Sequence, residues 1–371
     1  MVKNDYYLVD SVDLQAFTIS VFQKLGFSSE HAKDASEVLL AADLRGIDSH
    51  GSARLTGYVR LLKKGRINPT PKLEIEVETL STATLQADKS IGLVSAQYAM
   101  NLAIEKATIA GSGWVAVCNS NHFGIAGFYT MMAAQKDMIG IAMTNASPLV
   151  SPTNSKERLL GTNPIAFTFP GGKYSPIVID MATSAAANGK LEIASRKGLK
   201  IPTGWAHDKD GFSSSNANAI KEGGSLLPLG GEAESGGHKG YALSAAVDIL
   251  SGVLGGGGFG PWVPPFVDFL EPKHTEHGAG IGHFLGAIRV DAFRKKEHYF
   301  GAIEAWIERF KSSTPIDDDY PVLIPGEPET KMHQIRLKEG VPVISAVYED
   351  LSEIATNLEL DSIPYSKVIT Q

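Results

Sequence analysis

The sequence predicts an α/β protein in which helical segments from both ends of the chain form one unit and a mixed-sheet domain is inserted between them. Amphipathic helical patterns fill the N-terminal part, short β-branched runs then alternate with Ala-rich helices, and helical patterns return near the C-terminus. The 371 residues exceed the ~250–300 over which a single core usually grows. We therefore assign residues 1–75 plus 295–371 to a helical domain and residues 76–294 to an inserted α/β domain.

The helical domain begins with two amphipathic patterns. Residues 11–25 carry apolar side chains at helical spacing, and Ser11 is the expected N-cap. A second helix is expected over residues 29–44, with Gly46 as its stop. The prolines from Pro69 onward break the chain before the inserted domain.

A third helical pattern carries the most informative residues of the chain. If the chain is helical from Asp48 to Lys64, then His50, Arg54 and Tyr58 lie at i, i+4 and i+8 and share one face. An imidazole that titrates near neutral pH, a guanidinium that can clamp a carboxylate and a phenol suit a small organic acid that must exchange a proton. The alternative interpretation is a solvent-exposed helix face with one incidental histidine.

The later segments alternate between strand and helix patterns. Strands are expected at 73–80, 114–119, 139–144, 165–169, 177–180 and 285–290, and helices at 94–110, 127–136, 241–254, 291–311 and 345–360. Long Gly-, Ser- and Pro-rich loops lie between the last two strands, and so much irregular chain usually forms binding loops.

Composition excludes several classes of function. The formal net charge of −7 argues against a nucleic-acid partner. A single cysteine, Cys118, allows no disulfide within the chain and no Cys-based zinc site, and its place in an expected strand indicates a core residue rather than a nucleophile. No apolar run reaches the length of a signal peptide or a membrane span, so we expect a cytoplasmic protein without a membrane partner.

Two polar residues lie at or just after the ends of predicted strands. His122 comes after the strand 114–119, where α/β proteins usually carry their sites, and is a second general acid or base candidate. It could instead cap the next helix from a turn. Asp180 ends the strand 177–180 and could orient an imidazole, accept from a ribose hydroxyl or cap a helix that begins near Thr183.

Two glycine-rich segments are candidates for phosphate binding. Residues 255–260 spell G-x-G-x-x-G, but a predicted helix precedes them and Pro261 follows, so we reject a Rossmann interpretation. Residues 236–241 open a predicted helix with Lys239 beside it, which is either a phosphate site or an exposed glycine loop.

Three histidines in the late loop have spacings that could bind a metal. His274, His277 and His283 lack an acidic cluster around them, and histidines in a polar loop are usually only solvated. We therefore expect no metal site.

Six motifs in series resemble one known family. They are ADLRGIDSHG at 42–51, NHFG at 121–124, GTNP at 161–164, DMAT at 180–183, PTGWAHDKDG at 202–211 and HKGY at 238–241. Together they resemble the malate/L-lactate dehydrogenase family of the L-sulfolactate dehydrogenase-like type, from about residue 10 to 330. The resemblance implies an NAD(P)-dependent enzyme that interconverts 2-keto and 2-hydroxy acids, with a non-Rossmann cofactor fold in the inserted domain and a homodimer with sites near the subunit interface.

The resemblance also implies roles for individual residues. The active-site histidine would be His50 or His122, which differs among members, and Arg54 would bind the substrate carboxylate with Ser49 and Tyr58 beside it. The cofactor would lie along Ala146, Asp180, Met181, Ala182, Lys239, Pro325, Gly326 and Glu327.

The favoured hypothesis is a dehydrogenase with NAD, or alternatively NADP, acting on malate and oxaloacetate. In it, His122 donates the proton, His50 polarises the carbonyl and Arg54 holds the carboxylate. The alternatives are lactate, sulfolactate or ureidoglycolate as substrate, a cyclic imino acid, or a ligand-binding protein without catalysis. Residues 255–280 look longer than most members need, so the resemblance does not determine the substrate pocket or the substrate.

Overall fold

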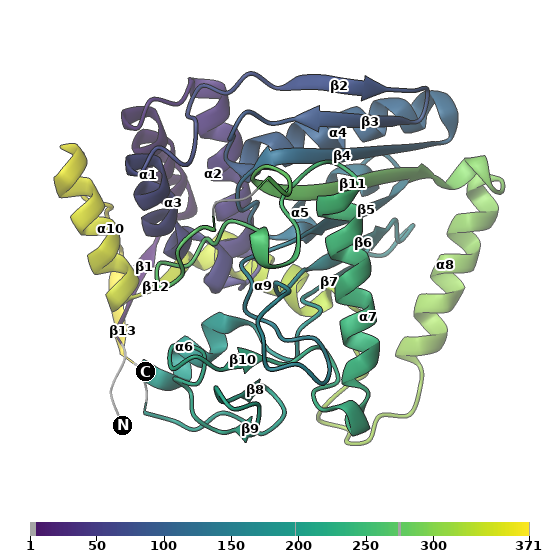
Figure 1. Cartoon of the computed structure of the whole chain (residues 1–371). Coiled ribbons are helices and arrows are strands. Elements are labelled where there is room, and N and C mark those ends of the chain that lie inside the picture. The colour runs from purple at the N-terminus through teal and green to yellow at the C-terminus, as the bar shows by residue number, and fades with distance from the viewer. Residues whose placement is uncertain (1–4, 197, 274–275, 371) are drawn as a thin grey trace.

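A seven-stranded mixed sheet forms the centre of the computed structural model, which describes residues 5–196, 198–273 and 276–370 (Figure 1). In spatial order, its strands are β2 (Glu74–Glu78), β3 (Thr82–Gln86), β4 (Ser112–Ser120), β11 (Ile281–Arg289), β5 (Met138–Thr144), β6 (Ile165–Phe169) and β7 (Ile177–Met181). Only β3 and β4 pair in parallel, and the other neighbours in this sheet are antiparallel. The predicted mixed α/β class is confirmed, although β3 was not predicted.

Strand β11 sets the geometry of the site because it lies between β4 and β5. It runs antiparallel to both, pairing Ile281 with Ser120 and His283 with Thr144. Strands β4 and β5 are therefore parallel to each other, and their carboxyl ends lie at the same edge of the sheet. The segments after those two ends contain His122 and Ala146.

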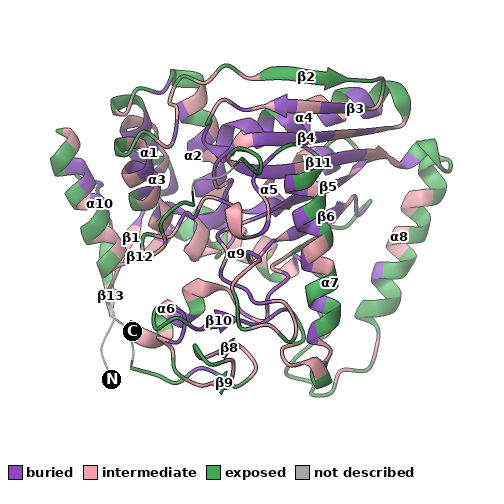
Figure 2. Cartoon of the chain, viewed as in Figure 1, coloured by how far each residue is buried: buried purple, intermediate pink, exposed green. Residues whose placement is uncertain are grey.

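Helices cover both faces of the sheet. Helices α4 (Gly92–Ala110) and α5 (Ala126–Ala134) pack on one face, and α7 (Gly237–Asp248), extended by a π-helical turn at Ile249–Val253, packs on the other. Figure 2 shows that most strands are buried, whereas β2 is exposed. Cys118 is buried in β4, as expected of a core residue.

Three helices form the N-terminal part of the fold, namely α1 (Ser11–Lys24), α2 (Ser29–Leu44) and α3 (Leu55–Lys63). The predicted N-cap of α1 is wrong by one residue. Asp10 has extended backbone angles and its carboxylate accepts the Val12 N–H, whereas Ser11 is already helical and buried.

Both ends of the chain meet in a second, three-stranded sheet. Strand β1 (Asp5–Val9) pairs antiparallel with β12 (Val341–Ile344) and with β13 (Lys367–Thr370), and α10 (Ser345–Leu358) follows β12. The C-terminal segment thus returns to the N-terminal helices, although the proposed boundaries at residues 75 and 295 stay predictions.

Two further helices precede this return. Helix α8 (Lys296–Lys311) is shorter at its start than the predicted 291–311, because a 3₁₀ turn at Val290–Ala292 comes first. It buries Ile307 beside the strands at the β7 edge of the sheet (Figure 1). Helix α9 (Glu327–Glu339) was not predicted and packs near α2.

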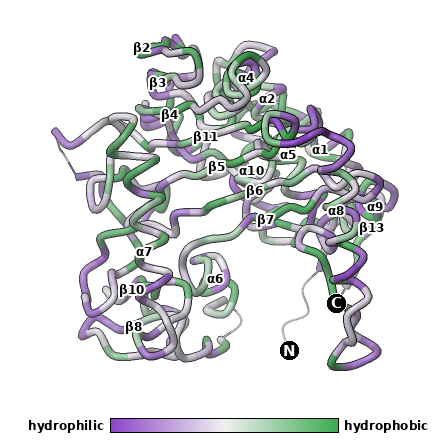
Figure 3. The backbone as a smooth tube through the Cα atoms, turned by 90° about the vertical axis from the view of Figure 1, so that its right-hand side faces the viewer, coloured by the Kyte–Doolittle hydropathy of each residue, from purple (hydrophilic) through white to green (hydrophobic). Residues whose placement is uncertain are grey.

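The predicted loop region contains a small unit with its own core. It holds α6 (Asn188–Arg196) and short strands β8 (Ala206–His207), β9 (Ser213–Ser214) and β10 (Ser225–Leu226). Figure 3 shows this unit gathered below the sheet and away from the chain ends. In the part of the chain that the structure describes, no helix has the length and apolar character needed to span a bilayer.

Candidate active site

The segment that carries His50 is not the continuous helix that its spacing predicts. Two 3₁₀ turns, Asp48–His50 and Ser52–Arg54, precede α3, and Gly51 between them adopts φ −90° and ψ −142°. Of the three predicted face residues, only Tyr58 belongs to α3. The shared helical face is therefore wrong, and the physical reason lies in the contacts of Gly51.

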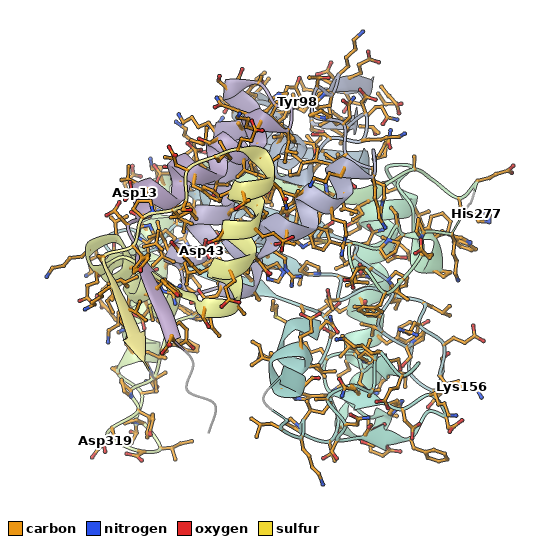
Figure 4. The ribbon with its side chains drawn as sticks, turned by 90° about the vertical axis from the view of Figure 1, so that its left-hand side faces the viewer. Asp13, Asp43, Tyr98, Lys156, His277 and Asp319 are labelled. Atoms are coloured by element: carbon orange, nitrogen blue, oxygen red, sulfur yellow. The ribbon has the colours of Figure 1, made fainter. Side chains whose placement is uncertain are left out.

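A buried carboxylate replaces the helical hydrogen bonds of this segment. Asp43 from α2 is 3% exposed, and its Oδ2 accepts the Ser52 N–H at 2.8 Å. A Cβ on Gly51 would lie 1.8 Å from Asp43 Oδ1, so only glycine allows this approach. Burial raises the pKa of Asp43 to about 7, although the Ser52 N–H opposes the shift. Figure 4 labels Asp43 among the N-terminal helices.

An arginine from the C-terminal half holds the same segment from the other side. Arg336 in α9 is buried and donates to the backbone carbonyl of Asp43 at 2.5 Å. It also donates to both carboxylate oxygens of Asp48. The position of residues 48–54 therefore depends on α2 and α9 together.

Tyr58 connects this segment to the end of β4. Its side chain is 0% exposed, and its Oη lies 2.7 Å from His122 Nδ1. The same nitrogen accepts the Gly124 N–H at 3.3 Å. Because a backbone N–H can only donate, the neutral His122 ring carries its proton on Nε2.

The predicted catalytic and substrate residues come together at this point. The His50 and His122 rings lie 5.6 Å apart with planes 26° from parallel. Ser49 Oγ lies 2.9 Å from His50 Nδ1, and the Arg54 Nε donates to the Ser49 carbonyl at 2.5 Å. All five residues, which sequence reasoning assigned to one site, are thus linked by direct contacts.

Both histidines are held neutral in the free protein. Burial, followed by the positive charge of Arg54, lowers the pKa of His50 to about 3. Burial also lowers the pKa of His122 well below its usual value, and His50, Arg54 and His283 add to the shift. A half-buried imidazole beside a guanidinium resists gaining a positive charge, so an anionic ligand would favour the protonated state.

A third histidine supports the site from within the sheet. His283 is fully buried, with Nδ1 2.7 Å from Thr144 Oγ1 and Nε2 2.8 Å from Ser120 Oγ. Its ring stacks on that of Phe123, the residue after His122, with 4.8 Å between the ring centroids. These contacts fix the adjoining ends of β4 and β5.

Two of the three candidate metal-binding histidines, His277 and His283, lie in different surroundings. His283 is inside the sheet, whereas His277 is exposed in a loop and packs on Trp262 at 4.1 Å (Figure 4). His274 lies outside the described residues. Across the described ranges, no group of three or more His, Cys, Asp or Glu side chains has metal-binding geometry.

Asp180, the last residue but one of β7, is exposed. Its Oδ2 accepts the Gly127 N–H at 2.7 Å at the start of α5. Partial loss of hydration raises its pKa to about 6 against the opposing effects of Gly127 and Arg45. The predicted helix near Thr183 is absent from the described chain, so Asp180 caps α5 rather than a helix of its own segment.

The late turn at 325–327 lies beside this strand. Pro325 accepts the Val178 N–H through its carbonyl at 3.0 Å, and α9 begins at Glu327. Gly326 has φ +92°, and a Cβ there would lie 2.9 Å from the Val178 Cβ. Asp180, Met181, Ala182 and the turn are therefore neighbours in space.

The side chain and backbone of Asn163 connect Ala146 to the segment that carries Ala182. The Asn163 side chain accepts the Ala146 N–H at 3.2 Å and donates to the Ser244 carbonyl in α7 at 3.1 Å. Thr183, next to Ala182, donates through Oγ1 to the Asn163 carbonyl at 2.9 Å. The motifs GTNP and DMAT contained both residues, but nothing in their spacing revealed that one bonds the other.

Lys239 reaches the same region through the start of α7. Leu229 donates its N–H to the Thr183 carbonyl at 2.9 Å, and a Cβ on Gly240 would lie 2.1 Å from the Leu229 carbonyl oxygen. Lys239 itself is exposed in the first helical turn. An accessible carboxylate and an exposed lysine at a helix start fit the hydroxyl and phosphate groups of a dinucleotide.

The prediction that residues 255–260 do not form a Rossmann motif is confirmed. Residues 255–260 follow the π-helical turn, not a strand, and lead into a 3₁₀ turn at Gly260–Trp262. Sequence reasoning did not identify Phe266, which follows this segment and packs on Tyr58 and His122.

Comparisons with known proteins agree with this geometry. The family model described as malate/L-lactate dehydrogenase matches residues 9–352. The chain is 45% identical to malate dehydrogenase of Pyrococcus abyssi, over 95% of this chain and 96% of that protein. It is 39% identical to L-sulfolactate dehydrogenase of Methanocaldococcus jannaschii, over 92% of this chain and 95% of that protein. The solved malate dehydrogenase of Pyrococcus horikoshii OT3 superposes with a TM-score of 0.86 at 40% identity, covering 96% of this chain and 97% of that one.

The Asp43 contact predicts a strict requirement for glycine at position 51. We expect Gly51→Ala to lower the free energy of unfolding by about 1–3 kcal/mol, because Asp43 or the backbone must shift. Urea denaturation measures the change. The matched control is Gly301→Ala in α8, where a Cβ meets nothing within 4 Å and helix propensity should add about 0.5–1 kcal/mol. Equal stability of Gly51→Ala and the unmodified protein would contradict the close contact.

Proposed function

The chain belongs to the malate/L-lactate dehydrogenase family, and we propose that it interconverts oxaloacetate and malate with NAD. Its family and relatives make it an oxidoreductase of 2-hydroxy acids that uses a nicotinamide cofactor. The observation that carries the proposal is the convergence of a cation, two neutral imidazoles and a buried phenol from separate segments of the chain.

Arg54 binds the carboxylate next to the keto group. Its Nε is already held by the Ser49 carbonyl, which fixes the guanidinium and leaves the terminal nitrogens for a bidentate pair. Such a clamp fixes the orientation of the neighbouring carbonyl and lowers the entropy cost of reaction.

His122 contacts the carbonyl oxygen through Nε2. In the neutral ring this nitrogen carries the proton, because Nδ1 accepts from Gly124. When bound, the reduced nicotinamide supplies a hydride to the carbonyl carbon. His50, 5.6 Å away by ring centroid, polarises the same carbonyl.

His122 transfers the proton once the substrate is bound. The negative charge of a keto acid opposes the effect of Arg54, so binding raises the pKa of His122 from its depressed value. In the imidazolium Nδ1 also carries a proton, so it gives up the Gly124 N–H and donates to Tyr58 Oη, which lies at 2.7 Å and can accept as well as donate. Tyr58 is thus a positioning residue that holds either protonation state of His122.

The cofactor lies along the Asp180–Ala182 segment, Ala146, Lys239 and the 325–327 turn. Asp180 accepts from ribose hydroxyls, and Lys239 offers a positive charge to a phosphate. We favour NAD over NADP because the Asp180 carboxylate, which would accept from the ribose, disfavours an additional phosphate there, although Arg45 lies near it together with Glu329.

Malate is the first candidate substrate, and sulfolactate is the second. The names of the relatives at 45% and 39% identity support this order. Both hydroxy acids present a carboxylate to Arg54 and differ in the second anionic group.

We also propose that the protein is a cytoplasmic homodimer. The α7 end and its π-helical turn expose Ile249, Val253 and Leu254, and exposed apolar side chains that lie close together favour a self-complementary contact.

A panel of keto acids tests the proposed reaction. We expect the protein to oxidise NADH faster than NADPH with oxaloacetate, and His122→Ala and His50→Ala each to lower kcat by at least ~10²-fold. Absorbance of the reduced nicotinamide measures turnover of oxaloacetate, pyruvate, sulfopyruvate and a cyclic imine. The control His298→Ala changes an exposed histidine on α8. If the protein binds the cofactor but turns over none of these substrates, the proposed reaction is wrong and the protein is a non-catalytic binding protein.

The Tyr58 hydrogen bond predicts a shift in the pH profile. Tyr58→Phe removes the acceptor for the His122 imidazolium, so the pKa of His122 falls and reduction is lost at a lower pH than in the unmodified enzyme. Because a hydrogen bond to a charged group contributes about 1.5–3 kcal/mol, kcat should fall at least about tenfold. The matched control Tyr348→Phe removes a hydroxyl that bonds Ile363. An unchanged profile would remove Tyr58 from proton transfer.

The raised pKa of Asp180 predicts pH-dependent cofactor binding. The ionised carboxylate accepts ribose hydroxyls, so affinity for NADH should weaken as pH falls through about 6. Asp180→Asn should bind NADH more weakly at pH 8 and lose the dependence near pH 6. Cofactor fluorescence measures the Kd, and Asp291→Asn, an exposed carboxylate paired with Arg289, is the control. A pH-independent Kd in the unmodified protein would exclude Asp180 from the cofactor contact.

A further inference from the structure

We propose that Phe266 is a specificity-determining residue that limits the size of the substituent on the keto carbon of the substrate. The inference rests on the proposed function and goes beyond it, because it concerns which 2-keto acids the site accepts. Phe266 belongs to the segment 255–280. Because of the length of this segment, the sequence alone does not determine the substrate pocket.

The ring of Phe266 contacts the residues that would hold the reacting group. Its centroid lies 4.6 Å from that of His122 and 5.2 Å from that of Tyr58. The guanidinium carbon of Arg54 lies 5.8 Å from the same centroid. The side chain is only 8% exposed, so it is enclosed by these groups rather than extended into solvent.

Several polar contacts hold the ring in this place. The Phe266 N–H donates to Ser147 Oγ at 2.9 Å, just after the end of β5. Arg60 in α3 donates to the Phe266 carbonyl and lies 3.5 Å from the Asp268 carboxylate. Arg66 donates to the Pro265 carbonyl at 2.7 Å.

Helix α3 is shaped to receive the ring. A Cβ on Gly57 would lie 2.4 Å from Phe266 Cζ, so a larger residue would push the ring away from its partners. The side chain therefore fills a fixed position between α3 and His122. A fixed ring can exclude a substituent, whereas a mobile one would move aside.

The bond geometry of a keto acid determines which atoms meet this ring. The carbonyl carbon bears the carboxylate, the oxygen and one carbon substituent, all in one plane. With the carboxylate on Arg54 and the oxygen at His122 Nε2, the substituent occupies the remaining direction. Hydride transfer requires one face of that carbon to stay open to the cofactor. A ring that borders both Arg54 and His122 covers the opposite face of that carbon. It thus restricts the room for the substituent on that face.

The ring also keeps water from His122. Burial is the largest cause of the lowered pKa of His122, and an apolar ring 4.6 Å away contributes to that burial. Replacing Phe266 with a small residue should admit water and move the pKa of His122 toward its ordinary value.

Substrate selectivity tests the proposal directly. Phe266→Ala and the more conservative Phe266→Leu are compared with the unmodified enzyme at saturating NADH, using oxaloacetate, pyruvate and a branched five-carbon 2-keto acid. We expect Phe266→Ala to raise the ratio of kcat/KM for the branched acid over pyruvate at least about tenfold, as expected for a change of one or more methylene groups in a pocket. Phe266→Leu should give a smaller increase. The pH profile of Phe266→Ala should shift to higher pH.

The controls separate this inference from the proposed function. Phe293→Ala removes an aromatic ring that is 81% exposed after β11, and its selectivity should equal that of the unmodified enzyme. Thermal unfolding verifies that each variant is folded. If Phe266→Ala is not folded, Phe266→Leu still tests the proposal. An unmodified enzyme that turns over no keto acid overturns the proposed function. An active enzyme whose folded Phe266 variants keep the original ratio overturns the role of Phe266 alone.

Discussion

The site depends on one buried interaction, the Asp43 carboxylate that accepts the Ser52 N–H against the bare backbone of Gly51. Without it, residues 48–58 could continue as one helix, which would carry His50 and Arg54 along the α3 axis. The carboxylate instead ends the helix at its N-terminal side and turns the preceding residues toward the end of β4. The cost is a partly neutralised buried acid, as its pKa near 7 indicates, and Arg336 offsets that cost by holding the neighbouring backbone and Asp48.

The same burial determines the electrostatics of the reacting groups. His50, His122 and Arg54 form a set in which a second positive charge is unfavourable, so the imidazoles stay neutral until an anion arrives. In the proposed mechanism, the negative charge of the substrate offsets the charge of Arg54, so protonation of His122 would depend on substrate binding. His283, neutral and bonded to Thr144 and Ser120, keeps the strand ends fixed without adding a charge.

Sequence patterns predicted the α/β class and most helices because apolar periodicity reports local burial directly. They could not predict β1, β12 and β13, whose pairing joins residues more than three hundred positions apart. The residue set of the site was predicted in part because His122 follows a strand and the motifs come in a familiar order. The helical face of His50 was wrong because a tertiary hydrogen bond from Asp43 overrides local helix spacing. Phe266 escaped notice because nothing in a loop sequence signals a contact with a histidine that lies more than a hundred residues earlier in the chain.

Helix α3 connects these features, since residues of a single turn contact both His122 and Phe266. Tyr58 contacts His122 through its hydroxyl, whereas Arg60 donates to the carbonyl of Phe266 and Gly57 leaves room for that ring. If both proposals hold, one short helix would link proton transfer to the size of the accepted substrate. A shift of α3 by even a few tenths of an ångström would change both the Tyr58 hydrogen bond and the position of the ring.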